Sequence, residues 1–311
     1  GQDQEQTVGL FLNTAAAAPG YTLFAPMSYN VTYLIDNNGE LVQSWPSEYR
    51  PGLSVYILEN GDLLRTRRLQ GQQFFQTGGR GGGVEILDWD GNLIWEFDYF
   101  SNQFWQHHDI ESLPNGNILL IAWEHKTDAE AIANGRNPIL LGGSSQPFGF
   151  WPDHIIEVDP DSNSVVWEWH VWDHIIQDDD SSKANYGVVS NHPELVNINY
   201  PIGPNTDGGD WLHINAVDYN AELDQIMLSV HHFGEIWIID HSTTTAEAAS
   251  HSGGNSGKGG DLLYRWGNPQ AYIGGNSNER MFFGQHDARW IENGSLTVSY
   301  THLTLPTNRE V

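Results

Sequence analysis

The chain alternates short runs of β-branched and aromatic residues with clusters of Gly, Asn and Asp. This pattern is typical of strands joined by tight turns. A helical pattern is confined to two short segments, Asp128 to Asn134 and Thr245 to Ala249. We therefore predict an all-β fold in which each of these two segments forms a turn or two of helix.

Two kinds of hairpin recur along the chain. The first kind is a strand that ends in an apolar residue and Asp, then a turn, then a strand that ends in Trp. Its copies span residues 33–45, 84–95, 154–169 and, in stretched form, 235–266. The second kind is a strand, a turn that is usually Asn-Gly, and an apolar strand. Its copies begin at Leu53, His108, His213 and His286. Asn-Gly between apolar runs strongly indicates a hairpin.

The two kinds of hairpin alternate four times. One copy of each supplies about four strands, the content of one propeller blade. We predict a β-propeller of four-stranded blades in residues 1–298, with roughly four blades visible and the ring incomplete. The Trp that ends each first-kind hairpin should fill the space between blades. A β-sandwich would give similar local signals but would not require the regular alternation.

The last residues, 299–311, begin neither kind of hairpin. They resemble the translated adapter sequence that ends some open reading frames from environmental sequencing. We expect a non-native tail here; a genuine closing strand is the alternative.

Two long segments, 126–152 and 173–210, interrupt the repeat. The second carries Asp178-Asp179-Asp180 and Asp207-Gly-Gly-Asp210, whose carboxylates are candidates for Ca²⁺. No spaced calcium-type loop is present, so solvation is the interpretation we favour. The Gly-rich run 77–83 lacks the Lys-Ser/Thr and the helix of a phosphate-binding loop.

The composition narrows the class of partner. The formal net charge is −27, which argues against nucleic acid and anionic membrane surfaces as partners. An acidic surface suits a secreted, periplasmic or cell-surface protein. The chain has no Cys, which excludes disulfides and cysteine-based sites, and no apolar run approaches the length of a membrane span.

The histidines fall at equivalent positions of the repeat. His108 lies eight residues before Gly116, and His286 lies eight residues before Gly294. His213 lies seven residues before Asn220, as His108 does before Asn115. Equivalent positions in blades lie on one circle around the axis, so three blades should direct a His to a common region. His231 ends the strand that pairs with the start of the His213 hairpin and should be its neighbour, with Asn215 nearby. His107 and His232 should face elsewhere, because side chains alternate along a strand.

Three interpretations of this cluster remain open. It is a metal site, since neutral His binds Zn or Cu; a catalytic site with a nucleophilic His and anion-binding neighbours; or a structural set that ties blades together. The repeat favours a functional site over a structural one.

At these residues the chain resembles the bacterial arylsulfotransferase family. The resemblance rests on Gly20-YTLFAP, Tyr33-LIDNNGELVQSW, His107-HDIESLPNGNILL, Asp210-WLHINAVDYN and Gly284-QHDARW. It implies a six-bladed propeller outside the cytoplasm that moves a sulfuryl group from a phenolic sulfate to a phenol acceptor, without a nucleotide donor. It also implies that His286 is transiently sulfated and that His108, His213 and Asn215 surround the sulfate.

One position departs from the family pattern. His231 stands where the family has an Arg, and a His is cationic only at lower pH. Arg265 and Arg289 are the candidates to bind the sulfate in its place. No cofactor is expected beyond the candidate Ca²⁺. The alternative function is a non-catalytic extracellular propeller that serves in binding, adhesion or surface assembly.

Overall fold

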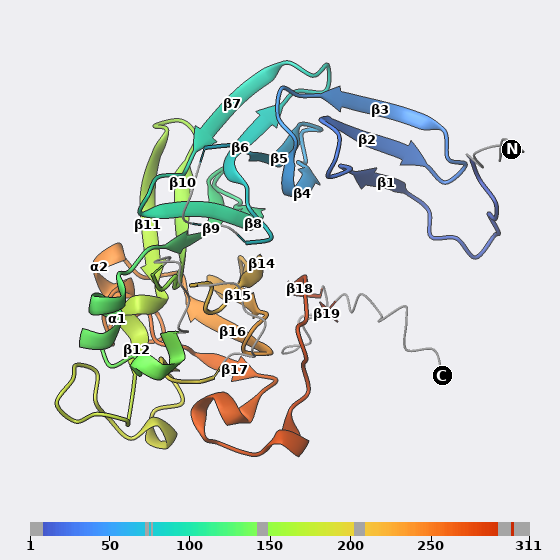
Figure 1. Ribbon diagram of the computed structural model, residues 1–311. Coiled ribbons are helices and arrows are strands. Elements are labelled where there is room, and N and C mark those ends of the chain that lie inside the picture. Colours follow the sequence, from blue (N-terminus) through green and yellow to red (C-terminus); the bar gives the residue numbers. More distant parts are fainter. Residues whose placement is uncertain are drawn as a thin grey trace, which may run out of the picture.

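The computed structural model describes residues 9–71, 75, 77–141, 149–201, 209–291 and 300–301. Four antiparallel sheets follow one another in an arc (Figure 1). A short two-stranded sheet, formed by β18 (Ala288–Arg289) and β19 (Tyr300–Thr301), lies near the centre of the arc. The predicted fold class is confirmed: the chain is all-β, built from four-stranded antiparallel sheets of the propeller type.

Three sheets have four strands and one has three. The first sheet comprises β1 (Tyr21–Phe24), β2 (Val31–Asp36) and β3 (Leu41–Pro46). The second comprises β4 (Pro51–Ile57), β5 (Leu63–Arg68), β6 (Gly82–Leu87) and β7 (Leu93–Asp98). The third comprises β8 (Phe104–Ser112), β9 (Ile118–Glu124), β10 (Asp153–Asp159) and β11 (Ser164–His170). The fourth comprises β14 (Ile214–Asn220), β15 (Gln225–Val230), β16 (Glu235–Asp240) and β17 (Tyr264–Trp266).

Shorter elements complete the described chain. β18 (Ala288–Arg289) pairs with β19 (Tyr300–Thr301), and β12 (Ile175–Ile176) runs parallel to β13 (Val196–Asn197). The two predicted helical segments form α1 (Asp128–Ala133) and α2 (Thr245–Ala248), each opened by a Thr–Glu capping box. Single 3-10 turns span Pro138–Leu141, Val171–His174, Val189–Asn191, Pro269–Tyr272 and Ser277–Glu279.

Each four-stranded sheet joins a second-kind hairpin to the first-kind hairpin that follows it. The pairing β4-β5-β6-β7 unites the hairpin that begins at Leu53 with the one that spans 84–95, and β8 to β11 and β14 to β17 repeat this order. The sheet boundary therefore falls before each second-kind hairpin, which makes its first strand the beginning of a new blade. The tight turns require left-handed backbone, which Gly61 (φ 90°) and Gly116 (φ 90°) supply at no steric cost.

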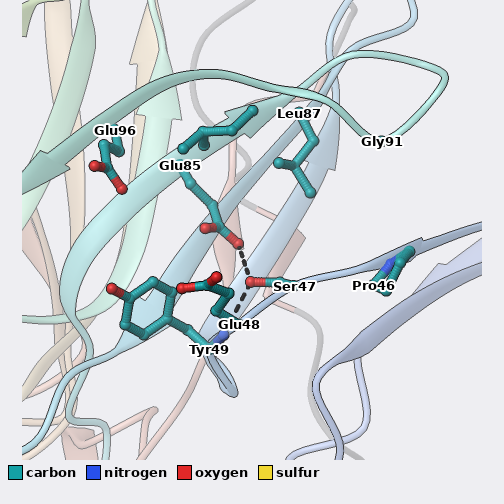
Figure 2. Close-up of a pocket in the computed structure, with 9 residues that line it drawn as sticks. Pro46, Ser47, Glu48, Tyr49, Glu85, Leu87, Gly91 and Glu96 are labelled. Atoms are coloured by element: carbon teal, nitrogen blue, oxygen red, sulfur yellow. Dashed lines mark hydrogen bonds between the residues drawn. The ribbon is translucent and has the colours of Figure 1, made fainter.

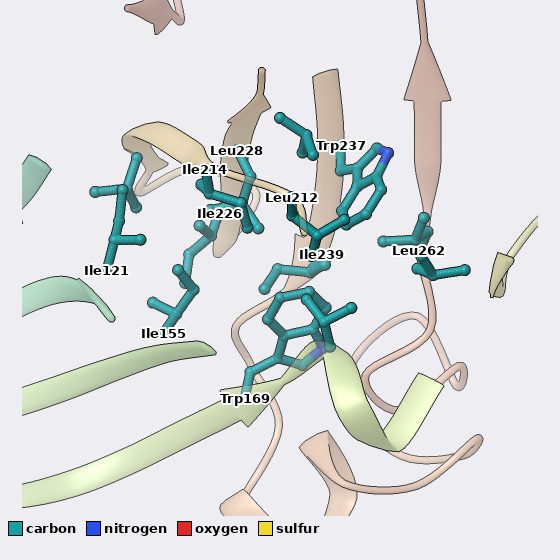
Figure 3. Close-up of a cluster of buried hydrophobic side chains, with 14 of the residues drawn as sticks. Ile121, Ile155, Trp169, Leu212, Ile214, Ile226, Leu228, Trp237, Ile239 and Leu262 are labelled. Carbon is teal, nitrogen blue, oxygen red and sulfur yellow. The ribbon is translucent and has the colours of Figure 1, made fainter. Parts of the chain in front are cut away.

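Apolar side chains fill the space between successive sheets. The largest cluster lies between the third and fourth sheets, where Ile121 and Ile155 face Ile214, Leu228 and their neighbours (Figure 3). Separate clusters join the first sheet to the second and the second to the third, and Ala288 of β18 packs on Met227 and Ile236 of the fourth. Burial of this apolar area is what holds neighbouring blades together.

Two of the Trp residues that end the first-kind hairpins fill the spaces between sheets completely, as predicted. Trp45 and Trp169 are completely buried, and their indole N–H groups donate to the carbonyls of Asp88 and Gly260. Trp95 is half-buried against the cluster between the second and third sheets. Trp266 is 43% exposed, and its ring contacts that of Phe282 with centroids 4.7 Å apart.

Backbone irregularities occur at the start of the first strands. The β4–β5 and β8–β9 registers shift between Pro51 and Val55 and between Gln106 and Ile110. Leu53 and His108, which lie inside these bulges, have φ of 105° and 49°. His213 directly precedes the irregular start of β14 and has φ of 55°. Three of the four equivalent repeat positions therefore have a positive φ, which L-residues adopt at a cost; in the fourth copy the positive φ, 54°, is that of Asp287, the residue after His286.

The structure describes only part of the candidate Ca²⁺ site and of the C-terminal segment 299–311. Asp179 accepts a hydrogen bond from Asn137 and Asp180 from Ser182, and among the described residues the Asp178–Asp180 run belongs to no cluster that could hold a metal ion. Asp207 lies outside the described residues. So does most of the 299–311 segment, and its non-native origin stays a prediction. In the described chain, no helix has the length and apolar character needed to cross a membrane.

His241 links the third sheet to the fourth through contacts with two carboxylates. Its Nε2 lies 2.8 Å from Glu157 of β10, and its Nδ1 lies 2.7 Å from Asp224 in the β14–β15 turn. Burial opposes the charged ring, but the two carboxylates outweigh it and raise the pKa of His241 above its ordinary value.

We predict that these His241 contacts make the free energy of unfolding depend on pH. Because the folded pKa is raised, the contribution is complete below the unfolded value of about 6.5 and is lost as pH rises through the folded pKa. His241→Gln should therefore lower the free energy of unfolding by about 1–2 kcal/mol at about pH 5.5 and by clearly less at about pH 8.5. Urea titration at both pH values measures this. His192→Gln, at a more exposed His–Glu pair, is the control and should show a smaller effect. An equal loss at both pH values would contradict the prediction.

Candidate functional site

Four histidine rings follow one another across the axis of the arc. The ring centroids of His108 and His213 are 4.5 Å apart, those of His213 and His231 are 5.3 Å apart, and those of His231 and His286 are 5.0 Å apart. They come from β8, the start of β14, the end of β15 and the residues before β18. Segments far apart in sequence are thus brought to one place by the repeat.

The predicted proximity of His213 and His231 is confirmed. Ile214 pairs with Val230, and the His231 N–H donates to the His213 carbonyl at 3.4 Å. The side chain of Asn215 donates to the carbonyl of Gln285 at 2.8 Å. Asn215 therefore fixes the backbone immediately before His286.

The prediction that the His107 side chain faces away from the histidine cluster is wrong. Nδ1 of His107 lies 2.8 Å from Nδ1 of His108, although the two are consecutive in one strand. The reason is the bulge: the left-handed φ of His108 breaks the alternation of side chains that a regular strand would impose. His107 is completely buried and its ring stacks on Trp123 with centroids 3.7 Å apart. His232 likewise lies beside the cluster, stacked on His213 at 4.9 Å.

Two buried carboxylates stand behind the histidines. Nδ1 of His213 lies 2.5 Å from Oδ2 of Asp210, whose other oxygen accepts from the indole N–H of Trp123 at 3.1 Å. Nε2 of His107 lies 2.8 Å from Oδ1 of Asp153. The sequence pattern indicates either carboxylate only weakly: Asp210 begins a segment of family resemblance, and Asp153 directly precedes a first-kind hairpin.

The ring of His286 is oriented by a neutral partner. One of its ring N–H groups donates to the Gly284 carbonyl. The Gln285 side chain in turn donates to the carbonyls of Val230 and Glu235, at 3.2 and 2.7 Å, which ties this segment to the fourth sheet. The second ring nitrogen of a neutral His286 then carries a lone pair.

Burial favours the uncharged form of His108, His231 and His286. It lowers the pKa of His108 well below its ordinary value and that of His231 to about 3, with repulsion from His213 as the next contribution in both cases. Burial also lowers the pKa of His286. At neutral pH these rings act as N–H donors and lone-pair acceptors, not as cations.

The two predicted sulfate-binding arginines lie in ion pairs. Arg265 forms contacts with both carboxylate oxygens of Glu235, at 2.5 and 3.2 Å, and with the carbonyls of Pro193 and Leu195. Arg289 contacts four carboxylates, those of Asp109, Glu111, Asp218 and Asp287. The structure thus brings the four histidines and Asn215 together but commits both guanidinium groups to acidic partners.

The geometry of the four rings suits an anion better than a metal ion. Two described clusters have three ligand atoms close enough for a metal, His174–His251–Asp261 and Asp210–His213–His232. No three of the four site histidines form such a cluster. In both clusters that qualify, His and Asp atoms already lie 2.5 to 2.8 Å apart, a hydrogen-bond separation and shorter than two ligands of one ion usually keep.

Two surface clefts lie away from the histidines. One, of about 330 Å³, is lined by Ser47, Glu48, Glu85 and Glu96 among others, and Ser47 donates to Glu85 within it (Figure 2). The other, of about 450 Å³, is lined by Arg136, Asp179, Asp180 and Lys183 among others. Both mix charges of each sign or are acidic, so neither offers the donor set of the histidine cluster.

The Gly-rich run 77–83 packs directly on the site. The His108 N–H donates to the Gly79 carbonyl at 2.7 Å, and Thr77 donates to Asp210 at 3.3 Å. A Cβ at Gly79 would lie 1.9 Å from the His108 ring, and the residue has φ of 84°. Only glycine permits this close approach.

We predict that Gly79→Ala displaces the His108 ring and lowers the free energy of unfolding by about 1–3 kcal/mol. Urea unfolding measures the loss, and the ring ¹⁵N signals of His108 measure the displacement. Gly78→Ala is the matched control, because a Cβ there meets nothing within 4 Å and Gly78 has no positive φ. Equal behaviour of the two variants would be inconsistent with the proposed packing.

Comparison with known proteins gives distant structural neighbours and one family. The Kuenenia stuttgartiensis hydrazine synthase is 12% identical with a TM-score of 0.43, over 80% of this chain and 59% of its own. The Comamonas testosteroni quinohemoprotein alcohol dehydrogenase is 11% identical with a TM-score of 0.39, over 80% of this chain and 34% of its own. The chain thus spans well under two thirds of the length of these two proteins. No curated protein matches it. The family model described as Arylsulfotransferase (ASST) matches residues 10–310, and the chain therefore belongs to the arylsulfotransferase family.

Proposed function

We propose that the chain is an extracellular aryl-sulfate sulfotransferase, which moves a sulfuryl group from a phenolic sulfate to a phenol acceptor through a sulfohistidine at His286. Family membership supports an aryl sulfotransferase-like activity. The observation that carries the residue assignment is the set of neighbouring rings of His108, His213, His231 and His286, with the His286 N–H held by a carbonyl.

His286 is the nucleophile in this proposal. Its free ring nitrogen attacks the sulfur, the S–O bond to the donor phenol breaks, and the phenolate leaves. The low pKa of His286 favours the neutral, nucleophilic ring. In the second half of the reaction a phenol acceptor attacks the sulfur of sulfohistidine and His286 is released unchanged.

The other rings surround the transferring group. Negative charge on the sulfuryl oxygens is stabilised by donors placed in advance, as in phosphoryl transfer. Asp210 contacts Nδ1 of His213 and so fixes the orientation of the His213 ring. His231 contributes a neutral ring at the position where the family pattern has a cation, and Asn215 supports His286 through the Gln285 carbonyl.

The alternative, a non-catalytic binding module, does not explain why His286 is backed by a carbonyl while His213 is backed by a carboxylate. A metal-dependent function at the same cluster is disfavoured by the spacing of its ligand atoms.

The first test is His286→Asn. With a chromogenic aryl sulfate and a phenol acceptor, we expect the variant to lose at least about 10³-fold in transfer rate, because the nucleophile is absent. Without acceptor, ³⁵S from a labelled donor should remain on the parent chain and not on the variant. His192→Asn, on an exposed side chain remote from the four rings, is the control. Unchanged transfer by His286→Asn would refute the assignment.

The second test is His231→Arg. A guanidinium there would add a fixed positive charge, and a charged hydrogen bond of about 1.5–3 kcal/mol corresponds to a fall of tenfold or more in KM for the aryl sulfate. His231→Gln supplies a neutral donor of similar size and should keep KM within about threefold of the parent. Initial rates at about pH 7 and about pH 9 measure both. A KM that is unchanged or raised by Arg would show that His231 does not face the sulfate.

A further inference from the structure

A line of three buried side chains leads away from the site through His108. Its Nδ1 lies 2.8 Å from Nδ1 of His107, and Nε2 of His107 lies 2.8 Å from Oδ1 of Asp153. His107 and Asp153 are completely buried and His108 is 8% exposed. The line therefore joins a ring at the site to an acid that solvent does not reach.

The contact between His108 and His107 and the contact between His107 and Asp153 together couple the positions of the ring protons. Burial lowers the pKa of both His107 and His108 well below the ordinary value, so each ring is neutral and carries one N–H. Only one of the two facing Nδ1 atoms then bears a proton. If His108 bears it, the Nε2 of His108 carries a lone pair. If His107 bears it, the His108 Nε2 bears a proton and the His107 Nε2, 2.8 Å from Asp153, carries a lone pair.

Asp153 is able to hold the matching proton. Burial raises its pKa well above the ordinary value, and the charge of Asp210 adds to this. The other charged or titratable groups that act on the line include Glu124 and the rings of His154, His213, His231, His232 and His286. The protonated acid and the two neutral rings form an uncharged arrangement, which burial favours over a charged one.

We propose that Asp153 and His107 are positioning residues that make His108 the general acid, and then the general base, of sulfuryl transfer. This inference rests on the proposed function. In the first half-reaction the His108 Nε2–H proton passes to the departing phenolate. The His107 Nδ1 proton then moves to His108, and the Asp153 proton moves to the Nε2 of His107. The line now carries one negative charge, located on Asp153.

The second half-reaction reverses these transfers. The acceptor phenol gives its proton to the His108 Nε2, the His108 Nδ1 proton returns to His107, and the His107 Nε2 proton returns to Asp153. The acceptor oxygen forms the new S–O bond as the S–N bond to His286 breaks. Donor, acceptor, enzyme and charge all balance over the cycle, and no further reactant is required.

A second His–Asp pair in the same chain shows why the arrangement is not ordinary packing. His174 contacts Asp261 through Nδ1 at 2.8 Å, but its Nε2 meets the Ala248 carbonyl at 2.8 Å. A carbonyl has no proton to exchange, so that pair ends there. The second ring nitrogen of His107 meets another imidazole instead. The Trp123 ring, stacked on His107 at 3.7 Å, holds this orientation.

Asp153→Asn tests the proposal by its dependence on the leaving group. General acid catalysis matters most for a poor leaving group. With unsubstituted phenyl sulfate we expect the transfer rate to fall about 100-fold, and with an electron-poor nitrophenyl sulfate less than about threefold. Asp261→Asn removes a comparably buried His-bound carboxylate and should leave the ratio of the two rates unchanged. His107→Gln should repeat the selective loss. Equal losses with both substrates would overturn the proposal.

A measurement without substrate separates this inference from the proposed function. In the folded 311-residue chain, ring ¹⁵N spectra report which nitrogen of His108 carries the proton. Asp153→Asn should change the His108 pattern, whereas Asp261→Asn should not. If the chain transfers no sulfate but the His108 signals respond, the proposed function fails and the coupling stands. If transfer proceeds and the signals of a folded Asp153→Asn chain are identical to the parent, the inference fails alone.

Discussion

A single guanidinium holds the first strands of the blades together beneath the histidine cluster. Arg289 of β18 contacts Asp287 at 2.7 Å, Asp109 at 3.0 Å, Glu111 at 3.1 Å and Asp218 at 3.6 Å. It also donates to the Val217 carbonyl of β14 and to the Tyr56 hydroxyl of β4. In a chain with a net charge of −27, such a cation is scarce.

The position of the histidines depends on this contact. Asp109 and Asp287 directly follow His108 and His286, so Arg289 fixes the backbone beside both rings. Burial raises the pKa of Asp109 to about 6 and that of Glu111 to about 8, even against the attraction of Arg289. Without the cation, the ionised members of the group Asp109, Glu111, Asp218 and Asp287 would repel one another. Arg289 therefore acts on the site through the backbone.

The repeat allowed the fold class and the meeting of the four histidines to be predicted from the sequence, because both follow from equivalent positions in successive hairpins. The contact of His107 with His108 was not predictable, since it requires a left-handed residue in a bulge and hence a break in the period of two. Asp153 reaches His107 only through the packing of β10 beside β9 and β8, which no local pattern encodes. The ion pairs of Arg289 were not predictable either, because its four carboxylate partners come from segments that only the fold brings together; a sulfate-binding role for Arg289 stays a prediction.

The partners behind each ring give the four histidines different chemical characters. His213 lies against Asp210, and His108 leads through His107 to Asp153, so an acidic group stands behind each of these two rings. His286 is backed by a carbonyl, which orients the ring but stabilises a positive charge on it far less. A sulfated imidazole is a cationic ring, and strong stabilisation of it would deepen the intermediate and slow the second transfer. In the proposed function, a neutral partner behind His286 and acidic groups behind its neighbours suit a reaction in which the same sulfuryl group must be both accepted and released.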